Sequence, residues 1–344
     1  MRKCLKIFIP VLALCSLIMI TYGNPASAQD LPRLRWILGT AEPSHQDWSI
    51  KPLDVMAENI AKRTGDKFTM KVTIGGELGI NREEIPMALQ TGKIQMAYLP
   101  GGHITGSIPH LGVFGLPFMI GSVKGINPDA MAMYEATEAM TVREFKKLNI
   151  APSVFFISTP AELISKKKID DMGDLKGLKV RTWDEATSSI AKTLNGVPVV
   201  MAATETYLAL QRGVVDAVIT GAPAMLTMSL NEQAPYLYMV NLAPPCIFIA
   251  TSMKIYDDLP KEYKDILQDE FKILRNTLFE AQKSALDDAL SGLRAKKTEI
   301  IEIKPDVMER VKAKVKPLWG EWAKKGPTNQ EAYDAVAKAL NLPK

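Results

Sequence analysis

The sequence has few of the residues from which metal sites and disulfide frameworks are built. It contains three cysteines, Cys4, Cys15 and Cys246, and three histidines without zinc-ligand spacing. The first two cysteines lie in an N-terminal segment that we expect to be removed, so Cys246 has no partner for an internal disulfide. We expect it to be a small buried hydrophobic residue. These absences predict a chain without a structural zinc site, bound metal or cofactor.

Recognisable catalytic and nucleotide-binding motifs are also missing. There is no G-x-S-x-G sequence, and Gly92-Lys93 is followed by Ile94 instead of the hydroxyl residue of a phosphate-binding loop. The glycines from Gly75 to Gly79 do not match the dinucleotide fingerprint. Adjacent acidic residues are most often solvated charges. We therefore expect a protein that is not an enzyme, with a periplasmic enzyme lacking known motifs as the alternative.

The N-terminus has the features of an export signal. Three basic residues precede an apolar stretch at 7–22 and a small-residue cleavage site at Ala26-Ser27-Ala28. The stretch has 16 residues, fewer than the roughly 20 of a membrane-spanning helix. Residues 1–28 are thus predicted to be a signal peptide, which implies a periplasmic protein. The remaining 316 residues suffice for two domains and carry a formal charge of +1, which does not suggest a nucleic acid partner.

Strand and helix patterns alternate along the chain. Short apolar or alternating runs predict strands at 34–38, 67–74, 94–99, 153–157, 178–182, 199–201, 214–219 and 246–251. Amphipathic patterns predict helices at 48–62, 83–90, 185–194, 205–213, 308–322 and 330–340. This alternation indicates an α/β fold with parallel strands. The strand at 246–251 comes too late to belong to the middle unit, so we expect a discontinuous domain arrangement.

A long amphipathic segment extends over residues 260–295. Its apolar residues recur at steps of three and four without an internal proline, so a helix of about 50 Å is expected. Such a helix could lie across two domains. A pair of helices broken near Ser284 is the alternative.

Several separated segments are similar to one family. The segments Asp174–Thr182, Asn195–Met201 and Glu205–Asp216 resemble the hallmark region of DctP-like receptors, the solute-binding proteins of tripartite ATP-independent periplasmic (TRAP) transporters. The N-terminal half resembles the same family at 76–79, 89–97 and 111–118. The similarity extends from about residue 34 to 260, with the motifs in the right order.

This resemblance implies a two-lobe periplasmic binding protein fold with crossing hinge strands and a long spanning helix. Lobe I would comprise residues 29–153 plus about 245–285, and lobe II residues 154–244 plus about 286–344. The protein would bind a small organic carboxylate and deliver it to the membrane permease subunits of a TRAP transporter, and we expect it to be a monomer. A binding protein that reports to a membrane sensor is a further alternative.

The resemblance also suggests the ligand site. In the family, an arginine at the position of Arg181 binds the ligand carboxylate, and a guanidinium suits this task because its planar fork of donors matches a carboxylate and stays charged. Trp183 stands where many relatives have proline, and it could form an apolar wall with Trp48 and Phe114. Core packing is the alternative for each of these three. The remaining candidate ligand-binding residues are Thr159, Thr220 and Glu205.

Two departures from the family pattern bear on the ligand. Many members carry Gly-Gln-Glu-Asn-Pro after the position of Asp216, whereas this chain has Ala217–Pro223, in which the Thr220 hydroxyl could replace the asparagine contact. Receptors for acidic sugars often carry a second arginine on the preceding strand, which here is the apolar segment Val154–Ile157. We therefore expect a monocarboxylate with an apolar or aromatic body, with a short dicarboxylate or keto acid as the alternative.

Overall fold

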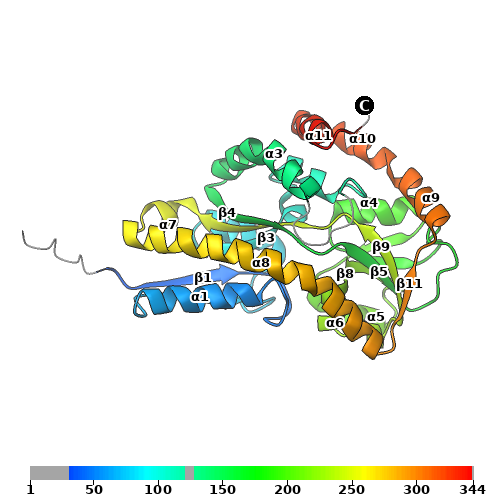
Figure 1. Ribbon diagram of the computed structural model, residues 1–344, viewed down its shortest axis with the longest axis horizontal. Helices are drawn as coiled ribbons and strands as arrows, with labels where there is room; N and C mark the ends of the chain where they lie inside the picture. The colour runs from blue at the N-terminus through cyan, green and yellow to red at the C-terminus, as the bar shows by residue number, and fades with distance from the viewer. Residues whose placement is uncertain (1–30, 121–127, 343–344) are drawn as a thin grey trace, which may run out of the picture. The chain divides into compact units, whose positions relative to one another are not determined.

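Two β-sheets, each covered by helices, organise the part of the chain that the computed structural model describes, residues 31–120 and 128–342 (Figure 1). The predicted signal peptide lies outside the described residues. No helix within the described residues has both the length and the apolar character needed to cross a bilayer.

The first sheet forms the centre of the half that we call lobe I. Its order is β2-β1-β3-β10-β4, with β1 Leu34–Gly39, β2 Phe68–Thr73, β3 Met96–Pro100, β4 Ile150–Ile157 and β10 Cys246–Ser252. Its helices are α1 Lys51–Arg63, α2 Ile85–Gln90, α3 Pro128–Lys147 and α7 Met253–Asp257. Strands β1, β2 and β3 are parallel, while β10 is antiparallel to both of its neighbours. Cys246 is buried in this sheet, as predicted.

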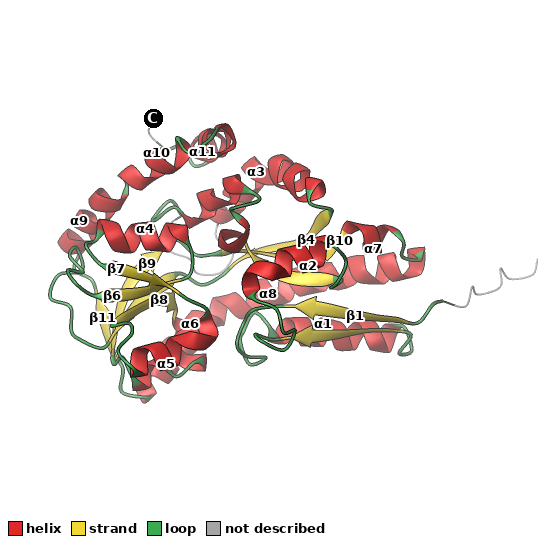
Figure 2. Ribbon diagram, turned by 180° about the vertical axis from the view of Figure 1, so that it is seen from behind, coloured by secondary structure: helices red, strands yellow, loops and turns green. Residues whose placement is uncertain are grey.

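The second sheet forms the centre of lobe II. Its order is β11-β9-β5-β8-β6-β7, with β5 Ala161–Ser165, β6 Lys179–Thr182, β7 Val197–Val200, β8 Ala217–Gly221, β9 Tyr236–Leu242 and β11 Glu299–Glu302. Its helices are α4 Glu185–Thr193, α5 Thr206–Gln211 and α6 Ala222–Thr227. Helix α4 covers one face of the sheet, and α5 and α6 cover the other (Figure 2). Each lobe thus has its own apolar core.

Two strand-to-strand crossings connect the sheets of the lobes, and they contact each other. Strand β4 of the first sheet leads directly into β5 of the second, and β9 of the second sheet leads into β10 of the first. The Ser158 amide donates to the Pro245 carbonyl at 2.9 Å, which joins the two crossings. Strands β5 and β10 are antiparallel to their neighbours because each arrives from the opposite lobe.

Helix α8, Lys261–Ala295, is one continuous helix that extends along both lobes (Figure 1). It packs against α1 and β4 in lobe I and against α6 and β11 in lobe II. The predicted single helix is confirmed, and the alternative break near Ser284 is wrong. Near its middle, the Gln282 side-chain amide donates to the carbonyls of Ile157 and Ser158, at 2.6 and 2.9 Å. The helix is therefore tied directly to the first crossing.

The structure differs from the expected elements in several places. The sheets divide the chain near residue 158, a few residues after the expected lobe boundary at 153, because all of β4 pairs with β10. The C-terminal segment forms α9 Pro305–Val315, α10 Pro317–Ala323 and α11 Pro327–Ala339, and α11 packs on α3 of lobe I. Proline at position 317 separates α9 from α10, where we expected one helix at 308–322. Helices α3 and α6 and strands β5, β9 and β11 were not expected from the patterns.

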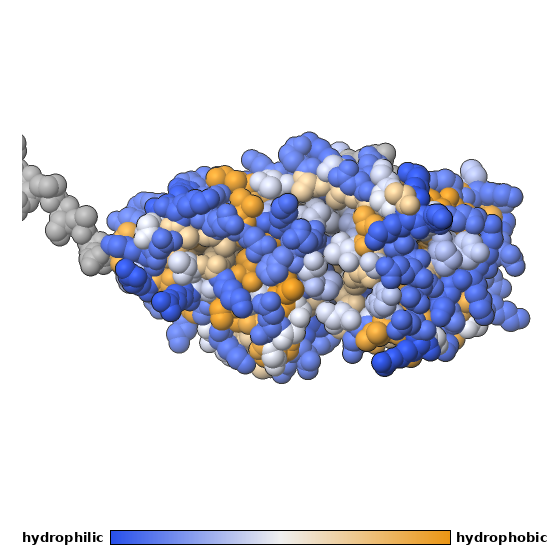
Figure 3. Space-filling view, turned by 90° about the horizontal axis from the view of Figure 1, so that it is seen from below, coloured by the Kyte–Doolittle hydropathy of each residue, from blue (hydrophilic) through white to orange (hydrophobic). Residues whose placement is uncertain are grey.

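The face of the molecule seen in Figure 3 is mainly hydrophilic. On the face seen in Figure 3, hydrophobic residues form separate patches among polar ones. The exposed large apolar side chains of the described residues are Val55, Met87, Val142, Val197, Val200, Leu208, Val214 and Ile273. Isolated exposed apolar residues of this kind are common on protein surfaces.

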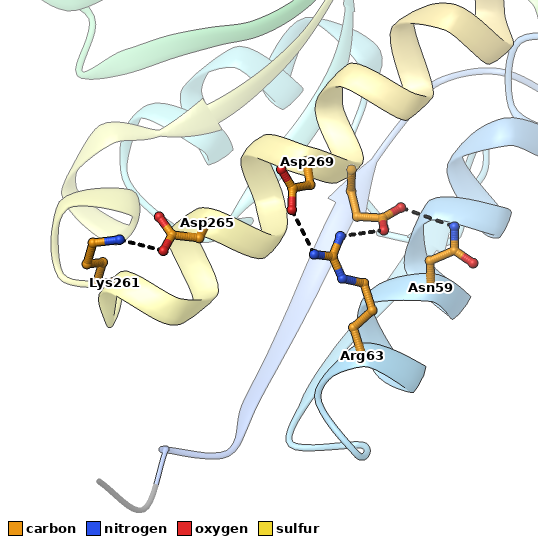
Figure 4. A network of polar contacts seen from close by, with 6 residues as sticks. Asn59, Arg63, Lys261, Asp265 and Asp269 are labelled. Carbon is orange, nitrogen blue, oxygen red and sulfur yellow. Dashed lines mark hydrogen bonds and ion pairs between the residues drawn. The ribbon is translucent and has the colours of Figure 1, made fainter. Parts of the chain in front are cut away.

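A buried acid connects α1 to α8 (Figure 4). Glu270 is 2% exposed, and its two oxygens accept hydrogen bonds from Arg63 Nη1 at 3.0 Å and Asn59 Nδ2 at 3.1 Å. The other Arg63 amino group, Nη2, binds Asp269 at 2.8 Å. Because Glu270 is buried, its charge depends on these donors.

We expect Arg63→Ala to lower the free energy of unfolding by about 2–3 kcal/mol, since Glu270 would be left buried with Asn59 alone. Chemical denaturation measures this loss. Lys62→Ala, which removes an exposed i,i+4 ion pair with Glu58, should change stability by less than about 0.5 kcal/mol. Adding Glu270→Gln to Arg63→Ala should recover part of the loss. Equal losses of stability in Arg63→Ala and Lys62→Ala would contradict the role of Arg63 as the partner of Glu270.

A second buried acid lies beside the crossings. Glu162, on β5, is fully buried, and its Oε2 accepts a hydrogen bond from the Asn241 amide at 2.8 Å. Its Oε1 has no hydrogen-bond partner among the described residues. Burial raises the pKa of Glu162 to about 8, although the backbone hydrogen bonds oppose the shift. The folded protein therefore holds a proton here at neutral pH.

Because the unfolded chain releases this proton near pH 4.5, Glu162 lowers stability progressively as the pH rises from about 5 to 8, by about 1.4 kcal/mol per pH unit. Glu162→Gln keeps the acceptor for Asn241 and should stabilise the protein more at pH 8 than at pH 5. Thermal unfolding at the two pH values, with the exposed Glu58→Gln as control, measures this difference. An identical shift of the melting temperature at both pH values would contradict a buried neutral carboxyl.

Candidate functional site

A cleft of about 130 Å³ lies between the lobes, where strand ends from both sheets meet. The carboxyl ends of β1 and β3 supply its lobe I side, and those of β6, β7 and β8 supply its lobe II side. Open α/β sheets place ligands at such ends because the loops that follow converge there. A cavity of about 150 Å³ accommodates a benzene molecule, so the cleft has a size suited to a small ligand.

Arg181 lies at the end of β6 and is 3% exposed. Its Nε and Nη2 donate to the Met201 carbonyl at 3.2 and 2.9 Å, which fixes the plane of the guanidinium. Nη1 has no hydrogen-bond partner among the described residues, and the side chain lines the cleft. Burial lowers the pKa of Arg181 to about 10, so the side chain remains a cation at neutral pH. The cleft therefore contains a buried, oriented cation with free donor capacity.

Arg82 supplies a second cation from lobe I. It opens a short 3-10 turn, Arg82–Glu84, that is held by a hydrogen bond of 2.6 Å from the Asn81 amide to Glu84 Oε2. Its Nε pairs with Glu83, and the rest of the guanidinium has no hydrogen-bond partner among the described residues. The side chain is 13% exposed. Arg82 was not expected from the sequence, because the second arginine of acidic-sugar receptors lies on the strand before the hallmark region.

Two hydroxyl groups face the cleft beside Arg181. Thr159, at the first crossing, is 3% exposed, and Thr220, at the end of β8, is 9% exposed. Neither side chain forms a hydrogen bond with another described residue. Both can therefore donate to an oxygen of a ligand carboxylate, which needs hydrogen-bond donors when it is buried.

Aromatic rings form the apolar walls. Trp48, in the loop after β1, and Trp183, immediately after β6, are partly exposed and line the cleft from opposite lobes. The Trp48 ring stands edge-on to Phe156 at a centroid distance of 6.2 Å, and Tyr98 also borders the cleft. Flat or apolar ligand groups can be buried between such rings.

Two carboxyl groups stand on the lobe I side. Glu42 and Asp47 lie in the loop after β1 and line the cleft. Burial and the neighbouring Asp47 raise the pKa of Glu42 to about 7, while Arg181 and Arg82 oppose the shift. Burial also raises the pKa of Asp47, against two hydrogen bonds from Ser49. The cleft thus combines positive and negative groups.

His103 lines the same side of the cleft from the short helix Gly101–Ile104. Burial, with Arg82 and Arg181 nearby, lowers its pKa to about 3. It is therefore neutral over the physiological pH range and adds no positive charge. Within the residues that the structure describes, no group of three or more potential metal-binding side chains gathers anywhere.

Two predicted site residues, Phe114 and Glu205, do not line this cleft. Phe114 is 1% exposed and packs on Phe155 at a ring distance of 5.6 Å, which is the core packing that we gave as its alternative. Glu205 accepts a hydrogen bond from the Ala202 amide at 3.0 Å at the start of α5, and its charge raises the pKa of Arg181. Glu205 therefore acts on the site through its charge.

A second cavity, of about 110 Å³, lies between α4, α10 and the 3-10 helix Pro109–Gly115, and Trp183 borders both cavities. Its walls are mainly apolar, and its charged side chains Asp184, Glu185 and Lys325 already have partners. Asp184 caps α4 by accepting from the Thr187 amide at 2.8 Å, and Glu185 pairs with Lys325 at 2.6 Å. We therefore take the first cleft, with its unpaired buried guanidinium, as the candidate ligand site.

Two α/β lobes joined by crossing strands and a long helix, with a cation buried in the cleft between them, define a two-lobe solute-binding protein. Residues 39–325 match the model of DctP, the bacterial extracellular solute-binding proteins of family 7, and the chain belongs to this family. The predicted resemblance and fold are thereby confirmed. The family consists of binding proteins, so the protein is an extracytoplasmic solute receptor and not an enzyme.

Similar proteins agree with this assignment. The chain is 26% identical to a solute-binding protein of Verminephrobacter eiseniae, over 80% of this chain and 81% of the relative. It is 24% identical to a monocarboxylate 2-oxoacid-binding periplasmic protein of a Nostoc species, over 94% and 88%.

Solved structures show the same fold. A TRAP solute-binding protein from a marine metagenome, specific for pyroglutamate, matches with a TM-score of 0.81 at 22% identity, covering 90% of this chain and 100% of that one. A sugar acid binding protein of Advenella mimigardefordensis, in complex with galactonate, matches with a TM-score of 0.81 at 22% identity, covering 90% and 99%.

Proposed function

We propose that the protein captures a small organic carboxylate in the periplasm and delivers it to the membrane permease subunits of a TRAP transporter. The observation that carries this proposal is the buried guanidinium of Arg181, which Met201 holds in place and whose Nη1 has no partner among the described residues. A buried cation with free donors lowers the stability of the folded protein unless an anion pairs with it. The names of the relatives in Nostoc and of the two structural neighbours refer to acids, which supports this ligand class.

The ligand that the cleft favours is a monocarboxylate with an apolar or flat body. Arg181 would bind the carboxylate, with Thr159 and Thr220 donating to the same group. The body would lie between Trp48 of lobe I and Trp183 of lobe II, so that closing of the lobes buries it on both faces. A bulky sugar acid is disfavoured because these rings occupy the walls.

Ligand binding is expected to depend on Arg181. In a thermal-shift screen of acids that includes phenylacetate, 4-methyl-2-oxopentanoate, pyroglutamate, succinate and galactonate, we expect a monocarboxylate to raise the melting temperature most. Arg181→Ala should weaken its binding about a hundredfold or more in calorimetry, because the ligand loses its buried counter-charge. Arg181→Lys keeps the charge but not the planar fork and should weaken binding less.

Arg212→Ala is the matched control, since that arginine is exposed at the end of α5 in the same lobe. It should bind as the wild type does. Near-native affinity of Arg181→Ala would remove Arg181 from the site. Stabilisation by succinate or galactonate alone would overturn the monocarboxylate part of the proposal.

The two tryptophans of the cleft are expected to report ligand binding. If Trp48 and Trp183 enclose the ligand, the best acid of the screen should change the intrinsic fluorescence, and Trp48→Phe and Trp183→Phe should each remove part of that change. Trp319 lies on α10, and its indole donates to the Pro117 carbonyl at 2.9 Å, away from the cleft lining. Trp319→Phe should therefore leave the ligand-induced change intact. A change that persists in full in both cleft variants would place the ligand elsewhere.

A further inference from the structure

The two carboxyl groups of the cleft are not explained by binding of a carboxylate at Arg181. Glu42 and Asp47 line the same cavity as the cation, and like charges close to a ligand carboxylate weaken its binding. The oxygens of these groups that accept no hydrogen bond fit a ligand that brings hydrogen-bond donors to that side. Their geometry shows which kind of group they can bind.

Asp47 is held in place with one oxygen free. It is 7% exposed, and its Oδ1 accepts from the Ser49 amide at 2.8 Å and the Ser49 hydroxyl at 2.7 Å. The Tyr98 hydroxyl lies 3.2 Å from Ser49 Oγ. Because Ser49 gives its hydroxyl proton to Asp47, Tyr98 must donate to Ser49, and this chain of donors ends at the carboxylate. Both hydrogen bonds from Ser49 end on Oδ1, so Oδ2 has no partner among the described residues, and Asp47 lines the cleft.

Glu42 is fixed through its backbone. Its amide donates to Thr40 Oγ1 at 2.9 Å, and its carbonyl accepts from the Gly75 amide at 2.8 Å. Its carboxyl group has no hydrogen-bond partner among the described residues, and the charge of Asp47 raises its pKa. Two neighbouring carboxyl groups therefore present acceptor oxygens to one side of the cleft, opposite the lobe that carries Arg181.

The charges around the cleft indicate which ligand group the carboxyl oxygens of Glu42 and Asp47 can bind. A ligand carboxylate offsets Arg181, and Arg82 is already paired through its Nε with Glu83. Neither Glu42 nor Asp47 forms an ion pair with a described residue, although the charges of Arg181 and Arg82 lower the pKa of Glu42. A hydroxyl on the ligand would offer one hydrogen and no charge, whereas a nitrogen group offers one to three hydrogens and a full or partial positive charge.

We propose that Glu42 and Asp47 form a second subsite that binds an N–H group of the ligand, so that the solute is a small carboxylate carrying an ammonium or amide nitrogen near its acid group. This inference rests on the proposed function, because it assumes that the carboxylate is bound at Arg181. It extends the monocarboxylate assignment by a nitrogen donor on the lobe I side. Each lobe then contributes one half of the recognition, and closure of the lobes requires both.

The test compares five-membered rings of nearly equal size by calorimetry. Proline carries an ammonium and pyroglutamate an amide N–H, while tetrahydrofuran-2-carboxylate and cyclopentanecarboxylate carry neither. We expect at least one of the nitrogen acids to bind at least tenfold more tightly than both rings without N–H. The tighter of proline and pyroglutamate identifies the charge of the donor.

Asp47→Asn keeps an oxygen for Ser49 but replaces the free acceptor with a donor, and Glu42→Gln does the same at the neighbouring position. Each variant should reduce the preference for the nitrogen acid to about threefold or less while leaving the affinity for cyclopentanecarboxylate nearly unchanged. Glu77→Gln, at an exposed position of the same lobe, should keep the full preference. Melting temperatures without ligand verify that the variants are folded.

The outcomes separate the two proposals. Equal binding of rings with and without N–H, lost in Arg181→Ala, would overturn the subsite and leave the carboxylate receptor intact. A nitrogen preference that survives both Asp47→Asn and Glu42→Gln would also overturn it. Binding of any of these acids that survives Arg181→Ala would overturn the proposed function itself.

Discussion

The architecture depends on the double crossing of the chain between two sheets. Because β4 continues into β5 and β9 into β10, the carboxyl ends of the parallel strands in the two lobes face one another across the crossings. The hydrogen bond from Ser158 to Pro245 and the contacts of Gln282 tie both crossings to the middle of α8. The loops that carry the cleft side chains are therefore placed opposite each other by the backbone.

The cleft is built around charges that the protein itself does not neutralise. Arg181 is anchored by a carbonyl, which fixes its orientation without cancelling its charge. On the opposite side, Asp47 is anchored by donors to one oxygen only. Leaving buried polar groups partly unpaired costs stability, and such sites are maintained where a ligand completes them. Arg181 and Asp47 lower the stability of the fold because they are buried and partly unpaired. We propose that the same groups make the cleft selective for its ligand.

Much of the fold could be predicted from the sequence because its signals are local. The 35-residue helix α8 follows from an uninterrupted pattern of three and four residue steps, and most strands follow from short apolar runs. Helix α3 could not be predicted in this way, since its buried face includes alanine, threonine and methionine instead of a stripe of large apolar residues. Strands β5 and β9, which adjoin the two crossings, were not expected from the sequence patterns.

For the site, the sequence alone predicted the family, and with it a ligand-binding role for Arg181, because motifs at fixed spacing record a shared backbone geometry. The resemblance led to Arg181, and the rule that ligand loops follow the carboxyl ends of strands, applied to β1, would also have found Glu42 and Asp47. Only the tertiary structure decided that Trp48, Trp183, Thr159 and Thr220 meet in one cleft and that Phe114 belongs to the core. The tertiary structure alone also placed Arg82 in the same cleft as Arg181, on the side of the other lobe. The physical reason is that burial, pairing and charge coupling depend on distances between residues far apart in the chain, which no local pattern contains.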